Sequence, residues 1–226
     1  MGKIDLYFDS VEWAPVTGEE ILREYFQSCQ GEVWGKIDQE PRDTLLTVNQ
    51  HNFVTQLVTK YRIEPLSILE DHLVVADYTA SDSSSLHHPH GQLSTPYSRL
   101  MQVIVFRLPC KGAEEVWKHI GRDRGHHQHQ ACWEDQEIIF EIKNRERDVI
   151  QIQTKAREML ALIRKRIALC NPAIAAYNAS LYTSLSHIVE QRRQWLHDNV
   201  RMVSEIVLGL RSASEDEKQV VEALRV

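Results

Sequence analysis

The sequence predicts an α+β protein whose N-terminal part is β-rich with short helices and whose C-terminal part is a long helical hairpin. Two observations predict this class. Up to about residue 144, β-branched and apolar residues gather in short runs between clusters of turn residues. After that point, apolar residues recur every three or four positions, which is the period of an amphipathic helix. We therefore expect a β-rich α+β domain at 1–144, a helical hairpin at 145–210 and a short helix or tail at 211–226.

Two short helices are predicted before the first long strand. Residues 19–26 begin with two acids, which interact favourably with the N-terminal end of a helix dipole, and Thr17 is a suitable N-cap. A second helix is expected to follow Asn49, another favoured N-cap, and to end before Pro65.

Strands are predicted at 72–78 and 100–108, because both stretches are rich in β-branched residues and bounded by turn clusters. The second stretch is apolar on both faces, which is typical of a central strand. Trp133 and the apolar run 138–142 flank the polar residues 134–136, which predicts a β-hairpin.

Two amphipathic helices are predicted in the C-terminal part. The first begins near Arg145 and the second at Asn171-Pro172, because Asn is a favoured N-cap and Pro is favoured at the first helical position. With almost no linker, the pair forms either a tight hairpin or a kinked rod, and we favour the hairpin because both apolar faces need cover. Gly209 is expected to end the second helix. The predicted interface, within the hairpin or with a second subunit or partner, is formed by Ile152, Met159, Ile163, Ile174, Leu181, Ile188 and Trp195.

Composition indicates a folded protein of the cytoplasm. Apolar residues make up 42% and charged residues 26% of the 226 positions, which disfavours disorder. No apolar run approaches the roughly 18 to 20 residues that cross a bilayer, and the first residues do not resemble a signal peptide. The four cysteines are scattered without a CxxC pair, which favours free thiols over a disulfide framework.

Charge is unevenly distributed along the chain. Residues 1–142 carry 12 Lys and Arg against 22 Asp and Glu, whereas residues 143–226 carry 14 against 10. An acidic front part and a basic helical part attract each other within one chain or between chains. The absence of aromatic residues among the helical charges disfavours a surface for stacking single-stranded bases. The candidate contacts to nucleic acid or to an acidic partner are Arg157, Arg164, Lys165, Arg166, Arg192 and Arg193.

Two histidine clusters are candidate metal sites, because imidazole is the commonest metal ligand. Each cluster precedes a predicted strand, so the two meet at one edge of a sheet only if those strands run parallel. Both fall in polar loops, which favours surface histidines, and we expect no cofactor. The candidate ligands are His87, His88, His90, His126, His127 and His129.

Glu141-Ile142-Lys143 matches the second half of a PD-(D/E)xK nuclease motif, in which carboxylates hold Mg²⁺ and the lysine assists the attack of water. The first half needs an aspartate on the preceding strand. Asp77 lies too far upstream, and Asp135 lies too close. Motifs of P-loop NTPases and of α/β-hydrolase nucleophiles are absent from the sequence. We therefore favour a protein that is not an enzyme, with Glu141 and Lys143 as an alternative catalytic pair.

Several stretches together resemble the N-terminal region of a poorly characterised group of bacterial proteins. They are KYRIEPL at 60–66, NPAIAAYNASL at 171–181, EQRR at 190–193 and LGL at 208–210. In that group a β-rich part leads into two long helices, and some members continue into a restriction-endonuclease-like domain. The resemblance implies an accessory or sensing component of a bacterial DNA-targeting or antiphage system, and it carries over no catalytic residue.

These observations predict a non-enzymatic interaction or assembly module that binds a protein partner or itself and does not contact a membrane. Two alternatives stay open. One is a metal-dependent nuclease-like enzyme, and the other is a nucleic-acid-binding protein that uses its basic helices.

Overall fold

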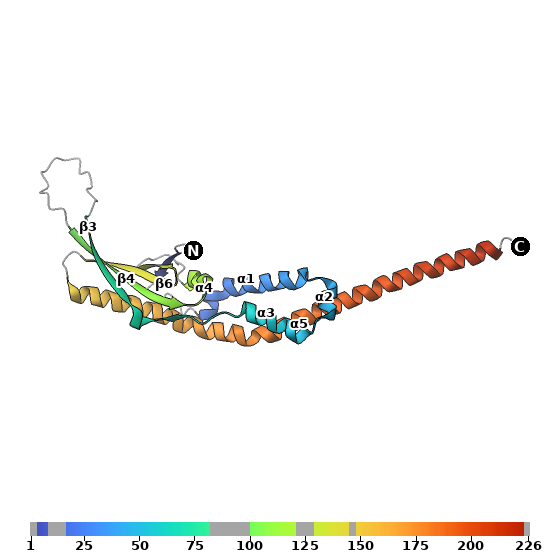
Figure 1. Cartoon of the computed structure of the whole chain (residues 1–226), viewed down its shortest axis with the longest axis horizontal. Coiled ribbons are helices and arrows are strands. Elements are labelled where there is room, and N and C mark those ends of the chain that lie inside the picture. The colour runs from blue at the N-terminus through green and yellow to red at the C-terminus, as the bar shows by residue number, and fades with distance from the viewer. Residues whose placement is uncertain (1–3, 9–16, 82–99, 121–128, 145–147, 224–226) are drawn as a thin grey trace, which may run out of the picture. The chain divides into compact units, whose positions relative to one another are not determined.

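The computed structural model of the chain describes residues 4–8, 17–81, 100–120, 129–144 and 148–223 (Figure 1). The chain forms two compact units, each discontinuous in sequence. Unit 1 comprises Met1–Gln27 and Ile63–Asn178, and unit 2 comprises Ser28–Arg62 and Ala179–Val226. Two helices, α1 (Gly18–Gln39) and α5 (Val149–Ala223), contribute residues to both units.

Unit 1 is built on an antiparallel sheet. The strand order is β1-β5-β6-β4-β2, and β3 pairs with β4 as well. β4 therefore has neighbours on both sides, as the apolar character of both its faces predicted. The strands are β1 (Ile4–Phe8), β2 (Ser67–Ile68), β3 (Val74–Ser81), β4 (Leu100–Lys111), β5 (His129–Glu134) and β6 (Glu137–Asn144).

The hairpin between β5 and β6 confirms the turn predicted at 134–136. Glu134 pairs with Glu137, so that Asp135 and Gln136 alone form the loop. Both loop residues have positive φ angles, 49° and 64°. Two consecutive positive φ values are the mark of a type I′ turn, whose twist matches that of the strands it connects.

The two faces of the sheet differ in burial, because residues in register on neighbouring strands share a face. One face is apolar and buried: Phe106 lies opposite Phe140, and their rings stack with centroids 4.9 Å apart. The other face carries exposed polar residues such as Arg107 and Glu141. This alternation is typical of an antiparallel sheet with one solvated face.

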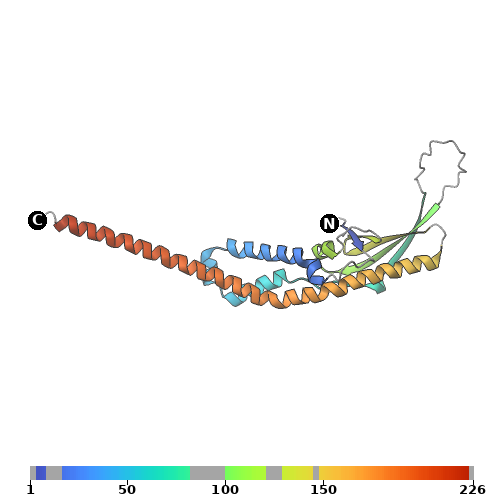
Figure 2. The same ribbon diagram turned by 180° about the vertical axis from the view of Figure 1, so that it is seen from behind.

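Helices complete unit 1. The first part of α5 runs along the sheet in both views (Figures 1 and 2) and buries Ile152, Met159 and Ile163. Asp148 caps this helix, since its Oδ1 accepts hydrogen bonds from the backbone N–H of Ile150 at 2.9 Å and of the following residue at 3.2 Å. A short helix, α4 (Glu114–Ile120), and a 3₁₀ turn, η1 (Glu70–His72), also belong to this unit.

Unit 2 is a small helical bundle. It consists of the second half of α1, α2 (Arg42–Thr47), α3 (Gln50–Tyr61) and α5 from Ala179 onward. Its core is formed by buried side chains from all four helices, which include Val33, Ile37, Leu45, Val54, Leu57, Leu181, Leu185, Val189 and Leu196.

Both predicted N-caps near the start of the chain are confirmed. Thr17 and Glu20 form a reciprocal capping box: Thr17 N donates to Glu20 Oε2 at 2.9 Å and Glu20 N to Thr17 Oγ1 at 3.2 Å. The side chain of Asn49 accepts a hydrogen bond from the backbone N–H of Asn52 at 3.1 Å. The helix that follows Thr17 continues to Gln39, well past the predicted end at residue 26.

The α+β class and the long helical C-terminal region are confirmed, but the predicted hairpin is wrong. α5 is one continuous helix that passes through Asn171-Pro172 and Gly209. The two apolar faces do not cover each other, because the first, together with Ile174, is buried in unit 1 and the second is buried in unit 2 from Leu181 onward. Of the described residues, no helix combines the length and apolar character needed to cross a bilayer.

Candidate functional site

The predicted interface residues are mostly core residues of a single chain. Ile152, Met159, Ile163, Ile174 and Leu181 are all buried, and they are therefore not available to a partner. Of the other two, Ile188 is half-buried and Trp195 is 52% exposed. Their neighbours Val189 and Leu196 take the buried positions. The last four predicted residues, from Ile174 to Trp195, are spaced by seven positions. Because two turns of an α-helix take slightly more than seven residues, the buried side of the helix shifts by one position along this stretch.

Beyond Leu196 the apolar face of α5 continues without cover. All residues from 201 to 210 are exposed. At 3.6 residues per turn, Val203, Val207 and Leu210 fall on the same side of α5 as Leu196, and Met202 and Ile206 extend that side toward Trp195. We call this surface the distal face: Trp195, Met202, Val203, Ile206, Val207 and Leu210, which are 42–67% exposed.

The distal part of α5 is also intrinsically a poor helix. Val200, Val203, Ile206 and Val207 are β-branched, and Gly209 lies in the helix interior, where glycine costs about 1 kcal/mol relative to alanine. No heavy atom lies within 4 Å of where a Cβ at Gly209 would be, so packing inside the chain does not require glycine there. Helices in proteins derive most of their stability from packing an amphipathic face. This segment therefore has an apolar face but lacks the cover that such a helix normally has.

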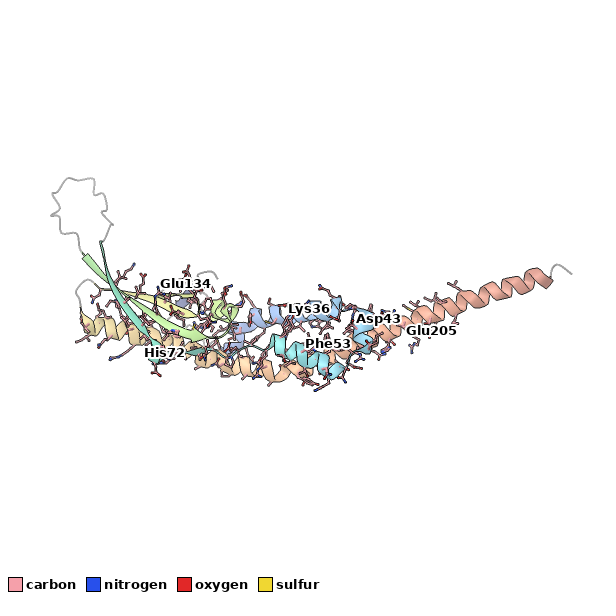
Figure 3. The ribbon with its side chains drawn as sticks, in the orientation of Figure 1. Lys36, Asp43, Phe53, His72, Glu134 and Glu205 are labelled. Carbon is pink, nitrogen blue, oxygen red and sulfur yellow. The ribbon has the colours of Figure 1, made fainter. Side chains whose placement is uncertain are left out.

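Both views show the end of α5 without another element of unit 2 beside it (Figures 1 and 2). Glu205 lies on α5 just past the labelled residues of the other helices of unit 2, Lys36, Asp43 and Phe53, and α5 continues beyond it (Figure 3). The described part of unit 2 thus leaves the distal face open.

An ion pair lies at the end of the part of α5 that packs against the other helices of unit 2. Arg192 contacts Asp38 of α1 at 3.0 Å, and its guanidinium lies 4.3 Å from the centroid of the Trp195 ring. An aromatic residue therefore does lie among the helical charges, contrary to the sequence prediction. Arg193 donates to the backbone carbonyl of Leu46 at 3.2 Å, which joins α2 to α5. These contacts fix α5 within unit 2 immediately before the distal face.

Arg164, Arg192 and Arg193 among the basic candidates are bonded within their own unit. Besides Arg192 and Arg193, Arg164 forms a bidentate pair with Glu70, in which Arg164 Nε donates to Glu70 Oε1 at 2.6 Å. This hydrogen-bonded pair lowers the pKa of the Glu70 carboxyl. Of the others, Arg157 and Lys165 are exposed and Arg166 is half-buried. The ion pairs and hydrogen bonds of Arg164, Arg192 and Arg193 within the chain reduce the positive charge of α5 that is available to bind phosphates.

The alternative catalytic pair lies on the solvated face of β6. Glu141 and Lys143 are both exposed there, and they alternate with the buried Phe140 and Ile142. The register places Asp77 level with Ile104, which is itself paired with Ile142. In this register Asp77 is thus level with Ile142 and not with Glu141. The described residues contain no group of three or more His, Cys, Asp or Glu that would hold a metal ion.

Of the candidate metal ligands, only His129 lies in the described part of the chain, as the first residue of β5. His87, His88, His90, His126 and His127 lie outside it. β4 and β5 are each antiparallel to β6 and hence parallel to each other. The strand direction required for the two clusters to meet at one edge is therefore present, and the metal site itself stays a prediction.

The cysteines are free thiols, and three of them are buried. Burial raises the pKa of both Cys110 and Cys170 to about 11. A reactive cysteine needs a lowered pKa and access to solvent, so the raised pKa and the burial of these two thiols disfavour a nucleophilic role.

Two asparagines of α5 have a role that the sequence did not reveal. The amide of Asn171 accepts from Leu66 N and donates to Leu66 O, both at 2.9 Å. Asn178 holds Ile63 in the same way, at 3.0 and 2.8 Å. We call this pair the asparagine clamp. It joins the stretches 60–66 and 171–181 of the bacterial resemblance. It also explains why Asn171 does not start a new helix. Asn171 and Asn178 are seven residues apart and therefore lie on the same face of the helix, and this spacing is the sequence signal that could have indicated the clamp.

Comparison of the chain with protein-family models, with curated proteins and with solved structures finds no match.

Proposed function

We propose that this protein is a non-enzymatic assembly module that binds another protein chain through the distal face of α5. One observation carries the proposal. A contiguous set of large apolar side chains lies exposed on a regular helix, directly after the point where the same side of that helix is buried. Contiguous exposed apolar patches are more typical of interaction sites than of the rest of a protein surface.

The energetics favour cover by a protein. Burying the exposed half of an aliphatic side chain contributes about 1 kcal/mol, roughly half the value for a fully exposed one. The six residues of the distal face together offer several such increments, and Trp195 adds an aromatic ring of the kind enriched at interfaces. Packing against an apolar helix would also stabilise the β-branched segment and offset the cost of Gly209.

The bacterial resemblance suggests the setting. We propose that the module is an accessory or sensing component of a DNA-targeting or antiphage system, in which α5 joins the chain to its assembly. A gene for a nuclease or ATPase directly beside the gene for this chain would support that setting, whereas unrelated neighbours would argue against it.

Site-specific photo-crosslinking tests the proposed surface. A photoreactive phenylalanine analogue replaces Ile206, whose side chain is 55% exposed on the distal face. The matched control carries the analogue at Glu205, the neighbouring residue, which points about 100° away around the helix. We expect a defined covalent adduct at position 206 and much less at position 205.

The mass of the adduct identifies the partner as a second copy or another protein. Absence of an adduct at position 206 in the cells that express the protein would contradict the proposed function. Equal yields at positions 206 and 205 would also contradict it, because they would indicate random collisions.

A further inference from the structure

We infer that the outer edge of β3 is a second docking surface, which takes an extended segment of another protein as an added strand of the sheet. The bound segment carries two adjacent apolar residues beside Val74 and Val75. β3 lies in unit 1 and the distal face in unit 2, so this surface is separate from the one proposed above.

β3 is an edge strand of the described sheet. It pairs with β4 through eight consecutive residues, from Val74 opposite Arg107 to Ser81 opposite Leu100. Among the described elements, only β4 makes extensive contact with β3. In an antiparallel pair, alternate residues direct their N–H and C=O groups toward the partner strand, and the others direct them away. Half of the residues of β3 therefore present backbone groups at an edge where no described strand pairs with them.

The two edges of the sheet differ in their protection. β1 ends the sheet on the other side; it has five residues, and α4 lies against it. Natural edge strands are commonly protected by short length, by Lys or Pro, or by a β-bulge. β3 has eight residues without Lys or Pro, Asp77 is its only charged residue, and its one-to-one register with β4 excludes a bulge. The edge of β3 thus permits a further strand to pair with it.

The first residues of β3 offer apolar contact on both faces. Val74 is 53% exposed and Val75 is 55% exposed, and successive residues of a strand point to opposite faces. Val75 is level with the buried Phe106, so the apolar face of the sheet is open at this edge. An added strand with apolar residues at two adjacent positions would therefore cover apolar surface on both faces.

The backbone determines the class of the occupant. Outward N–H and C=O groups along an extended strand are matched by another extended backbone at a distance of about 4.8 Å. A helix satisfies its own backbone groups and does not pair with such an edge. Hydrogen bonds between main chains supply the affinity, and the two valines select the neighbouring side chains of the bound segment.

A second copy of β3 fits this edge less well than another segment. In an antiparallel pair that uses all eight residues, Val74 comes level with Ser81 of the other copy. A pair centred on Val75 brings apolar residues together, but the two copies of β3 then overlap only over residues 74–76, because η1 precedes the strand. Neither arrangement combines full-length pairing with an apolar residue beside each valine.

Peptide selection on the full-length chain tests the inference. A phage-displayed library of random peptides is selected against the immobilised protein, and the enriched peptides are synthesised. We expect these peptides to share two adjacent apolar residues and to slow the deuterium exchange of backbone amides in residues 74–81. Light scattering on the chain without peptide gives its oligomeric state.

Single N-methylation along an enriched peptide gives a readout that is specific to strand pairing. Each methyl group removes one possible hydrogen bond between backbones, so it should weaken binding about tenfold at alternate positions and have little effect at the positions between. Val75→Pro and Ala76→Pro are matched variants, because the N–H groups of adjacent residues point to opposite edges of β3. One variant should lose stability toward urea, since it interrupts the pairing with β4, and the other should retain more stability and lose peptide binding.

Three results would overturn this inference. They are a selection that enriches no peptide, equal effects of N-methylation at every position, and unchanged peptide binding in both proline variants. A dimer whose β3 amides already exchange slowly without peptide would show that a second copy holds the edge, and would overturn another protein as the occupant. The photo-adduct at Ile206 is independent of all these results, so that their failure leaves the proposed function standing.

Discussion

α1 lies so close to α5 at Gly18 that a side chain at this position is expected to destabilise the protein. Gly18 is buried at the first residue of α1. A Cβ added there would lie 2.0 Å from the backbone oxygen of Leu169, 2.7 Å from its carbonyl carbon and 3.1 Å from the Cα of Cys170. All three are backbone atoms of a helix and cannot rotate away, so one helix must move by more than 1 Å relative to the other to restore an ordinary contact.

We expect Gly18→Ala to lower the free energy of unfolding by about 3 kcal/mol, the upper end of the range for overpacking. For a chain of this size, that change corresponds to a fall in Tm of roughly 6–12 °C. The assay is urea denaturation followed by circular dichroism, with thermal melting as a second measurement.

The matched control is Gly35→Ala in the same helix. No heavy atom lies within 4 Å of a Cβ at Gly35, and its exchange for alanine removes the conformational freedom of glycine from a helix interior. We expect Gly35→Ala to stabilise the protein by about 0.5–1 kcal/mol. If Gly18→Ala were as stable as Gly35→Ala, the packing of α1 on α5 described above would be incorrect.

Two further predictions concern buried groups. Asn178→Ala should lower the free energy of unfolding by about 2–3 kcal/mol, because it leaves the buried backbone N–H and C=O of Ile63 without partners. The control Gln194→Ala removes only an exposed hydrogen bond to Asp198 and should change the free energy of unfolding by less than about 0.5 kcal/mol in the same urea titration. Similar values for the two variants would argue against the clamp. Cys110 and Cys170 should react with a thiol reagent much more slowly than the half-buried Cys29 in the native protein at pH 8. Because their pKa values are raised to about 11 in the folded state, these thiols keep their protons where unfolded thiols have lost them, so stability should fall as the pH rises from about 9 to 11, and a pH-independent stability across that window would contradict the assignment.

Features of the fold that depend on nearby residues could be predicted from the sequence. The capping side chains of Thr17 and Asn49 act on residues three positions away, and the β5–β6 hairpin connects neighbouring strands. The central position of β4 followed from apolar residues on both of its faces. Each of these signals lies within a window of about a dozen residues, where propensity and periodicity are informative.

The course of α5 could not be predicted in this way. Asn171-Pro172 is a strong local signal for a helix start, but the amide of Asn171 is bonded to Leu66, which lies 105 residues earlier in the chain. Gly209 is a strong local signal for a helix end, yet the helix continues through it. At Asn171 a contact distant in sequence overrides the local preference, whereas at Gly209 the helix continues although residues 201–210 are exposed. The distal face was missed because the predicted interface residues ended at Trp195, although Met202, Val203, Ile206 and Val207 lie before Gly209.

Backbone hydrogen–deuterium exchange of residues 199–210, measured at a high and a low protein concentration, tests the central claim most directly. The amides of residues 181–196 in the same helix provide the internal control, since they are covered within unit 2. We expect slow exchange at 199–210 in the assembled state, faster exchange after dilution or in the Ile206→Glu variant, and no change at 181–196. Exchange at 199–210 that is the same at both concentrations and in the variant would show that nothing covers the distal face.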